Sequence, residues 1–382
     1  MSNPLEYAPK SSLDHKNMKI CMISGLAKFS GGLENVVGDL SKILMRRNVE
    51  VNIFGRSNKD FVESEYNCKI IGVRPYTLYP HGIGLPHYGK FGYNLKTWQK
   101  IKTYGPYDII HGHGDNCFFS SIFRDDTPFL MTFHGTMVKV LEGSINLRNR
   151  PFLYAEKAAA DRCDIAVACS KAVKNELITH YNASSKKIQV IHNGVNVEKF
   201  VPIDKKEARK KLSLPENNTY ALWVGSNPQR KRLPTAIKAV ENSQCSKLLV
   251  VGMDGKNLGK TVFLGKLSEQ DLITAYSAVD ILLFPTIYEG FPVAPLEALA
   301  CGLPVIVSEE SNIGEIIQEG THGFVVKDEN PLAYQEKINQ IINNATTLSE
   351  MSLKCRNLAL NYSWQKQAEK YWILYQRLLK NH

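Results

Sequence analysis

The sequence predicts an α/β fold of two domains, each built around a parallel sheet. Short apolar runs alternate with amphipathic segments along most of the chain, which is the order expected of strand–helix–strand units. The alternation starts again at Tyr220, after a polar and lysine-rich stretch. A length of 382 residues exceeds one typical core and is sufficient for two.

Composition places the chain among ordinary globular proteins, with 43% hydrophobic and 22% charged residues. No apolar run approaches the roughly 20 residues that span a bilayer. Residues 1–17 lack the apolar centre of a signal peptide, so we expect a flexible leader and a cytoplasmic location. The eight cysteines are scattered without a C-x2-C pair, which favours reduced, buried thiols over disulfides or a zinc site.

The net charge is +10, and the excess lies mainly before Lys199. Such a bias suits peripheral contact with an anionic membrane or a phosphate-bearing acceptor, although a solvated basic face with no partner explains it equally well. No basic run is interleaved with aromatic residues, so nucleic acid is not an expected partner.

The first half opens as a strand–helix–strand unit. Residues 19–24 form an apolar run, the apolar positions of residues 33–44 recur at helical spacing, and residues 49–55 form a second apolar run. The glycines do not follow G-x-G-x-x-G spacing, and Phe54-Gly55-Arg56 ends the second strand without an acidic residue. These two departures argue against a dinucleotide cofactor.

Further buried strands of the first half are predicted at residues 68–73, 107–114, 128–135 and 164–170. His134 stands at the carboxyl end of one of them, where ligand groups gather in parallel sheets, although a histidine that only caps a strand is the alternative. His111 and His113 have no carboxylate or cysteine at metal-ligand spacing. We therefore expect them to line a cleft and to bind no metal.

The second half repeats the pattern. Apolar runs predict strands at residues 220–226, 247–253, 261–265, 281–284, 304–310 and 323–328, with a helix at residues 269–278. Residues 362–380 predict a long helix with one apolar and aromatic face, made by Trp364, Ala368, Tyr371, Trp372 and Tyr375.

Residues 280–307 are the most informative stretch. The strand at residues 281–284 is followed by a glycine-containing loop and by a helix that starts near Pro292 or Pro295 and stops at Gly302. Free N–H groups at such a helix start suit a diphosphate. Two carboxylates, Glu289 and Glu297, flank that point, although they can also be ordinary surface charges.

The run EGFPVAPLEALACGLPVI, with its two glutamates, resembles the signature of the retaining glycosyltransferases of family 4, and the likeness extends over the chain from Met18 onward. The resemblance implies the GT-B fold, in which two Rossmann-like domains face each other across a cleft. It implies transfer of a hexose from a nucleotide-sugar donor of the UDP-glucose or GDP-mannose type to a glycan, lipid or lipid-linked acceptor. No side chain of the run is an obvious covalent nucleophile, which favours a front-face displacement, and we expect neither a metal nor a cofactor.

The loop at residues 226–231 resembles that of lipopolysaccharide core glucosyltransferases, because Ser226 replaces an arginine common in the family while Arg230 and Lys231 are kept. The resemblance assigns catalytic roles to His134, Arg230, Lys231 and Glu289. It assigns substrate binding to Gly31, Gly32, Asn193, Ser226, Gly290, Phe291, Pro292, Val293, Ala294 and Glu297. The alternative interpretation is that residues 230–232 form a solvated basic turn.

The resemblance also divides the chain. After the leader, residues 18–196 are expected to bind the acceptor, residues 197–362 to bind the donor, and residues 363–382 to cross back onto the first domain. A sugar-nucleotide epimerase of the same architecture is the competing interpretation. A nucleotide-binding module without catalysis is the third, and the paired Glu289 and Glu297 argue against it.

Overall fold

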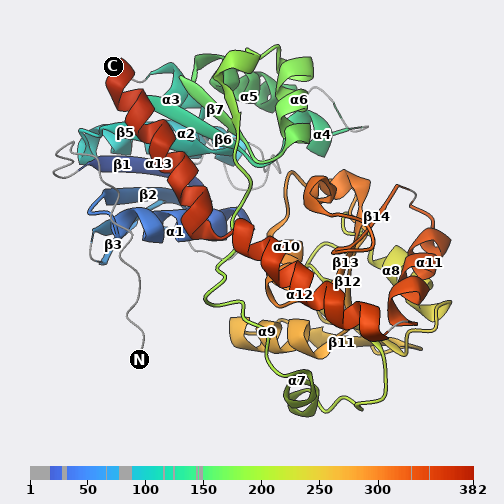
Figure 1. Ribbon diagram of the computed structural model, residues 1–382. Coiled ribbons are helices and arrows are strands. Elements are labelled where there is room, and N and C mark those ends of the chain that lie inside the picture. Colours follow the sequence, from blue (N-terminus) through green and yellow to red (C-terminus); the bar gives the residue numbers. More distant parts are fainter. Residues whose placement is uncertain are drawn as a thin grey trace.

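The computed structural model describes residues 18–27, 32–65, 67–76, 88–114, 117–123, 125–142, 145, 149–327, 329–343 and 345–382. Figure 1 shows two α/β domains side by side, each with its own sheet. The predicted α/β class with two mainly parallel sheets is confirmed. The predicted leader, residues 1–17, and Gly31 lie outside the described residues.

The first sheet has eight strands in the order β3-β4-β2-β1-β5-β6-β7-β8. The strands are β1 (Lys19–Leu26), β2 (Glu50–Arg56), β3 (Phe61–Glu65), β4 (Cys68–Val73), β5 (Ile109–His113), β6 (Phe129–Phe133), β7 (Ile165–Ala168) and β8 (Ile188–Val190). All neighbours pair in parallel except β3, which runs antiparallel to β4 at one edge. Parallel strands with buried side chains need helices on both faces of the sheet. The helices are α1 (Gly32–Met45), α2 (Tyr88–Tyr104), α3 (Phe118–Ile122), α4 (Met137–Val140), α5 (Arg150–Arg162) and α6 (Lys171–Tyr181).

The second sheet has six parallel strands in the order β11-β10-β9-β12-β13-β14. The strands are β9 (Tyr220–Val224), β10 (Lys247–Val251), β11 (Thr261–Gly265), β12 (Ile281–Phe284), β13 (Val305–Ser308) and β14 (Gly323–Val326). The helices are α7 (Lys205–Lys211), α8 (Leu233–Glu241), α9 (Glu269–Ala278), α10 (Val293–Ala300), α11 (Pro331–Ile342) and α12 (Ala345–Asn361). Strand β12 lies inside this sheet, so the loop that follows it opens at the carboxyl edge.

The last helix, α13 (Trp364–Asn381), leaves the second domain and runs along the first, as Figure 1 shows in red. It packs on α1, and Arg47 forms an ion pair with Glu369 across that contact. The aromatic face identified in the sequence is buried, with exposures of 0 to 8% for Trp364, Ala368, Tyr371, Trp372 and Tyr375. The chain crosses between the domains at Val195, whose N–H donates to the Tyr362 carbonyl at 2.9 Å.

Within the described part of the chain, no helix has the length and apolarity needed to cross a membrane. All eight cysteines are free and buried. Small buried thiols of this kind pack as apolar side chains.

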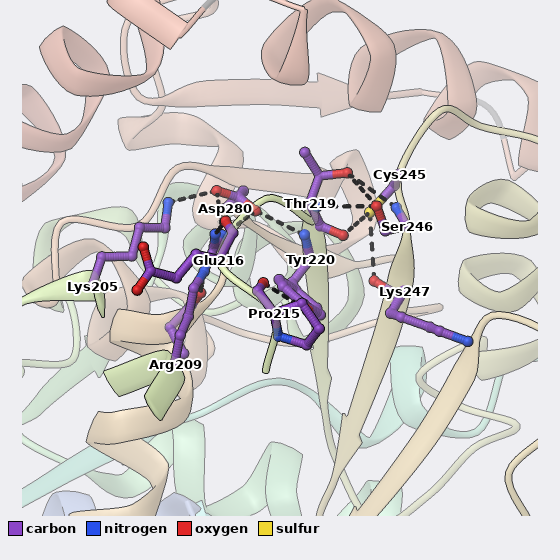
Figure 2. Close-up of polar contacts among 11 residues, drawn as sticks. Lys205, Arg209, Pro215, Glu216, Thr219, Tyr220, Cys245, Ser246, Lys247 and Asp280 are labelled. Carbon is purple, nitrogen blue, oxygen red and sulfur yellow. Dashed lines mark hydrogen bonds and ion pairs between the residues drawn. The ribbon is translucent and has the colours of Figure 1, made fainter. Parts of the chain in front are cut away.

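A buried ion cluster holds the first strand of the second sheet in place. Figure 2 shows Lys205, Arg209 and Tyr220 converging on Asp280, the residue before β12. The Arg209 guanidinium lies 3.0 Å from one Asp280 oxygen, and the Tyr220 N–H donates to the same carboxylate at 2.7 Å. Asp280 is only 5% exposed and Arg209 only 7%. The carboxylate therefore fixes α7 against the start of β9 and β12.

Replacing Asp280 by alanine should destabilise the protein strongly, because the Arg209 guanidinium would stay buried without its partner. We expect a loss of about 3 to 5 kcal/mol in the free energy of unfolding, measured by denaturant titration. Lys205→Met is the matched control: Lys205 also contacts Asp280 but its side chain is 39% exposed. It should cost less than about 1 kcal/mol. Equal, small losses in both variants would contradict a structural role for the cluster.

Candidate active site

A cavity of about 560 Å³ lies between the two domains. Every predicted site residue that the structure describes lines it: Gly32, His134, Asn193, Ser226, Arg230, Lys231, Glu289, Gly290, Phe291, Pro292, Val293, Ala294 and Glu297. The volume falls within the range of pockets that bind small molecules. The structure thus brings together residues more than 260 positions apart along the chain.

The loop after β12 and the start of α10 form one wall of the cavity. Helix α10 begins at Val293, with Pro292 in an extended conformation before it. The helix stops before Gly302, whose φ of +72° is the left-handed geometry predicted for this glycine. The first N–H groups of α10 lack partners within the helix, so this wall offers hydrogen-bond donors to an anion.

Two basic side chains face this wall from the loop between β9 and α8. Arg230 Nη1 lies 2.8 Å from Glu289 Oε1, and Lys231 Nζ lies 3.9 Å from the same oxygen. Arg230 Nη1 also donates to the Tyr288 carbonyl at 3.2 Å. The alternative of a freely solvated basic turn does not describe Lys231, whose side chain is only 16% exposed.

Lys231 is held in a partly dry position. Its ammonium lies 4.8 Å from the centre of the Phe284 ring and 3.4 Å from the Val224 carbonyl oxygen. Burial lowers the pKa of Lys231, while the Glu289 carboxylate opposes that shift. A cation with little solvent interacts strongly with any anion that enters the cavity.

Glu297 lies half-buried on α10 and lines the same cavity as the basic pair. The Tyr276 hydroxyl donates to Glu297 Oε2 at 3.0 Å. Burial raises the pKa of Glu297 to about 7, although the bond from Tyr276 opposes the shift. The carboxyl group therefore titrates close to neutral pH and can accept hydrogen bonds from hydroxyl groups when ionised.

His134 reaches the cavity from the end of β6. Burial lowers its pKa to about 4, so the ring is neutral at ordinary pH. Its Nε2 lies 3.1 Å from His113 Nδ1, and the two rings stack. Because both rings are neutral, one of these nitrogens donates its proton to the other.

The expectation that His111 and His113 line the cleft is wrong. Both are fully buried on β5, and neither lines the cavity. His111 Nδ1 is hydrogen-bonded to the Tyr375 hydroxyl of α13 at 2.7 Å, and its Nε2 to Thr132 at 2.8 Å. Helix α13 covers this part of the sheet, which a pattern local to β5 could not reveal. No cluster of three or more His, Cys, Asp or Glu side chains able to hold a metal occurs among the described residues.

The two domains come into close backbone contact at Gly290. A β-carbon added to Gly290 would lie 2.1 Å from the His134 carbonyl oxygen and 2.9 Å from Cys169 Sγ. No side chain fits there, so glycine is required for the approach itself. The same contact sets the position of Glu289 relative to His134.

Gly290→Ala should therefore push the loop after β12 away from the end of β6. We expect a loss of roughly 1 to 3 kcal/mol in the free energy of unfolding, the usual cost of overpacking. Gly32→Ala is the control, since an added β-carbon there meets no atom within 4 Å. A Gly290→Ala protein as stable as the control would show that the domains separate freely at this point.

Four further residues line the cavity and were not predicted from the sequence: Leu33, Asn35, Val36 and Leu272. The first three lie at the amino end of α1, which faces the cavity. Leu33 and Val36 belong to the apolar face of the helix, whose spacing signals only burial, and the exposed Asn35 carries no motif. Leu272 lies on α9 and carries no motif. Tyr276, the partner of Glu297, was missed as well, because its contact joins two helices that are separate in sequence.

The structure has the architecture of a nucleotide-sugar glycosyltransferase. Two Rossmann-like domains meet at a cavity that contains a basic pair, two carboxylates and the start of a helix. Comparison with known families agrees. Residues 30–199 match the model of Glycosyltransferase Family 4, and residues 204–359 match that of Glycosyl transferases group 1. The chain therefore belongs to this two-domain glycosyltransferase family, and the predicted resemblance is confirmed.

Individual relatives are distant but match along nearly the whole chain. A D-inositol 3-phosphate glycosyltransferase of Streptomyces bingchenggensis is 24% identical, over 89% of this chain and 83% of the relative. The structure of sucrose-phosphate synthase from Thermosynechococcus elongatus superposes with a TM-score of 0.82 at 22% identity, covering 96% of this chain and all of that one. Anabaena HepE, solved with UDP and glucose, gives a TM-score of 0.74 at 17% identity, covering 94% of this chain and all of HepE. These structures support the fold.

Proposed function

We propose that this glycosyltransferase moves a hexose from a nucleoside-diphosphate sugar, of the UDP-glucose or GDP-mannose type, to an acceptor with retention of anomeric configuration. The observation that carries the proposal is that Arg230 and Lys231 face the start of α10 across one cavity. A diphosphate needs such a concentration of positive charge and free N–H groups. HepE, of the same fold, is a protein solved with UDP and glucose.

In the proposed reaction, the acceptor oxygen attacks the anomeric carbon from the face that the diphosphate leaves. The departing diphosphate oxygen takes the acceptor proton. Arg230, Lys231 and the start of α10 stabilise the negative charge that grows on the leaving group. These groups supply the charge that a divalent metal supplies in other enzymes, so we expect transfer without a metal or cofactor.

We assign the remaining residues the roles that the family resemblance implies. Glu289 and His134 lie beside the reacting sugar, with His134 as a neutral polar group because of its low pKa. Glu297 accepts hydrogen bonds from the ribose. Asn193, Ser226 and residues 290–294 surround the donor, and Gly32 with the first domain faces the acceptor.

We propose a glycan, lipid or lipid-linked acceptor, reached from the cytoplasm, with peripheral contact between the basic first domain and an anionic membrane. The positive net charge supports the membrane contact. The test of the function is incubation with a panel of UDP- and GDP-hexoses, with and without candidate acceptors. Acceptor-dependent release of nucleoside diphosphate is the expected result. Interconversion of the donor sugar without release would instead indicate an epimerase.

Lys231→Ala should lower turnover by about two to three orders of magnitude, because loss of one such contact costs roughly 2.7 to 4 kcal/mol in the transition state. The measurement is kcat at saturating donor. Lys238→Ala is the control, since Lys238 is an exposed lysine on α8 and does not line the cavity. Wild-type turnover in a folded Lys231→Ala protein would remove Lys231 from the diphosphate site.

The two glutamates should differ in their kinetic effects. Glu297→Gln should raise the donor KM, because a ribose contact is similar in the ground and transition states. Glu289→Gln should lower kcat, because its contacts tighten as the sugar ring gains positive charge. The opposite pattern would reverse the two roles.

The pH dependence of the donor KM separates the two glutamates further. The pKa of Glu297 is raised to about 7, so its carboxyl group loses its proton as pH rises through that value. The ionised form accepts hydrogen bonds more strongly, and the wild-type donor KM should fall over the same interval. In Glu297→Gln the KM should stay flat between pH 6 and 8.

A further inference from the structure

Tyr288 crosses from the second domain to the first immediately before Glu289. Its hydroxyl donates to Glu176 Oε2 at 2.7 Å and accepts from the Thr136 N–H at 3.1 Å. Glu176 lies on α6 and Thr136 precedes α4. Both hydrogen-bonding capacities of the phenol are thus directed at the first domain.

The receiving side of this contact is buried and internally hydrogen-bonded. Glu176 is 8% exposed and Thr136 is fully buried. The Thr136 hydroxyl donates to the same Glu176 oxygen at 2.7 Å, so two hydroxyl groups converge on one carboxylate oxygen. Burial raises the pKa of Glu176, while these two bonds and the charges of Lys139 and His180 oppose the shift. A carboxylate in such surroundings depends on each of its donors.

The contact between Tyr288 and Glu176 lies next to active-site residues in both domains. Tyr288 is next to Glu289 in sequence, and its carbonyl accepts from Arg230 Nη1 at 3.2 Å. On the first domain, Thr136 is two residues from His134. The Tyr288 ring also lies 3.1 Å from the position of a β-carbon added to Gly135. A shift of the phenol would therefore move Glu289 relative to His134.

We propose that Tyr288 and Glu176 are positioning residues, which hold Glu289 and Gly290 of the second domain at a fixed distance from His134 of the first. Neither side chain lines the donor cavity. Their effect on transfer rests on the proposed function, in which Glu289 and His134 lie beside the reacting sugar. Their effect on the position of the loop after β12 does not depend on the proposed function.

Kinetics on Tyr288→Phe, Glu176→Ala and the double variant test the role in transfer. Each single change should lower kcat about ten-fold or more, since a hydrogen bond to a charged group is lost. The donor KM should stay within about two-fold, because Lys231 and Glu297 are untouched. The double variant should be no worse than the poorer single variant, because both changes break the same contact. Glu176→Gln should recover part of the rate, because its amide oxygen accepts the same bonds.

The control is Tyr154→Phe, which removes a hydroxyl from a side chain that is 70% exposed, and should leave kcat unchanged. If Tyr288→Phe keeps the wild-type kcat, even with a lowered melting temperature, the contact has a structural role only. Multiplied losses in the double variant would show that the residues act independently. Either result overturns the proposal.

Hydrogen exchange of backbone amides in residues 286–291 tests the positioning without any substrate. Exchange should be faster in Tyr288→Phe and Glu176→Ala than in the wild type and in Tyr154→Phe. Unchanged exchange overturns the proposal. If the wild type transfers no hexose from any donor, the proposed function fails, and the exchange rates still decide whether this contact fixes the loop.

Discussion

The close approach of Gly290 to the His134 carbonyl is the constraint on which the site depends. The basic pair and both glutamates belong to the second domain, while His134 belongs to the first. Neither sheet alone assembles the cavity. Since an added β-carbon at Gly290 would lie 2.1 Å from that carbonyl oxygen, the distance between the two sets of groups is fixed by backbone contact. The crossing helix α13 and the buried cluster at Asp280 hold the elements that carry this contact.

Electrostatics then decide what the cavity can bind. Arg230 and Lys231 share the Glu289 carboxylate, at 2.8 and 3.9 Å, so the basic pair is already oriented toward the loop. A diphosphate at the start of α10 would meet these cations with little reorganisation, which is the condition for strong transition-state stabilisation. Glu297, with a pKa of about 7, adds a hydrogen-bond acceptor whose strength depends on pH.

Much of this was predictable because the signals were local. Apolar runs predicted the central strands, Gly302 predicted the end of α10, and the motif around Glu289 predicted the cavity wall. The antiparallel edge strand β3 was missed, because the short and polar sequence FVESE has little strand character. The burial of His111 and His113 and the contact of Tyr288 with Glu176 could not be predicted, because they join residues from different parts of the chain. Such partners are known only after the fold brings the elements together.

The central claim is that Arg230 and Lys231 bind the diphosphate of the donor, and phosphorus NMR of UDP or GDP titrated with the full chain tests it most directly. The account predicts that the β-phosphorus resonance shifts and broadens with the wild-type protein. With the Arg230→Met, Lys231→Met double variant, it predicts that the β-phosphorus resonance stays at the position of the free nucleotide. The fold of this variant is checked by circular dichroism. Unchanged binding of both nucleotides by that variant, with the same β-phosphorus shift, would contradict the account.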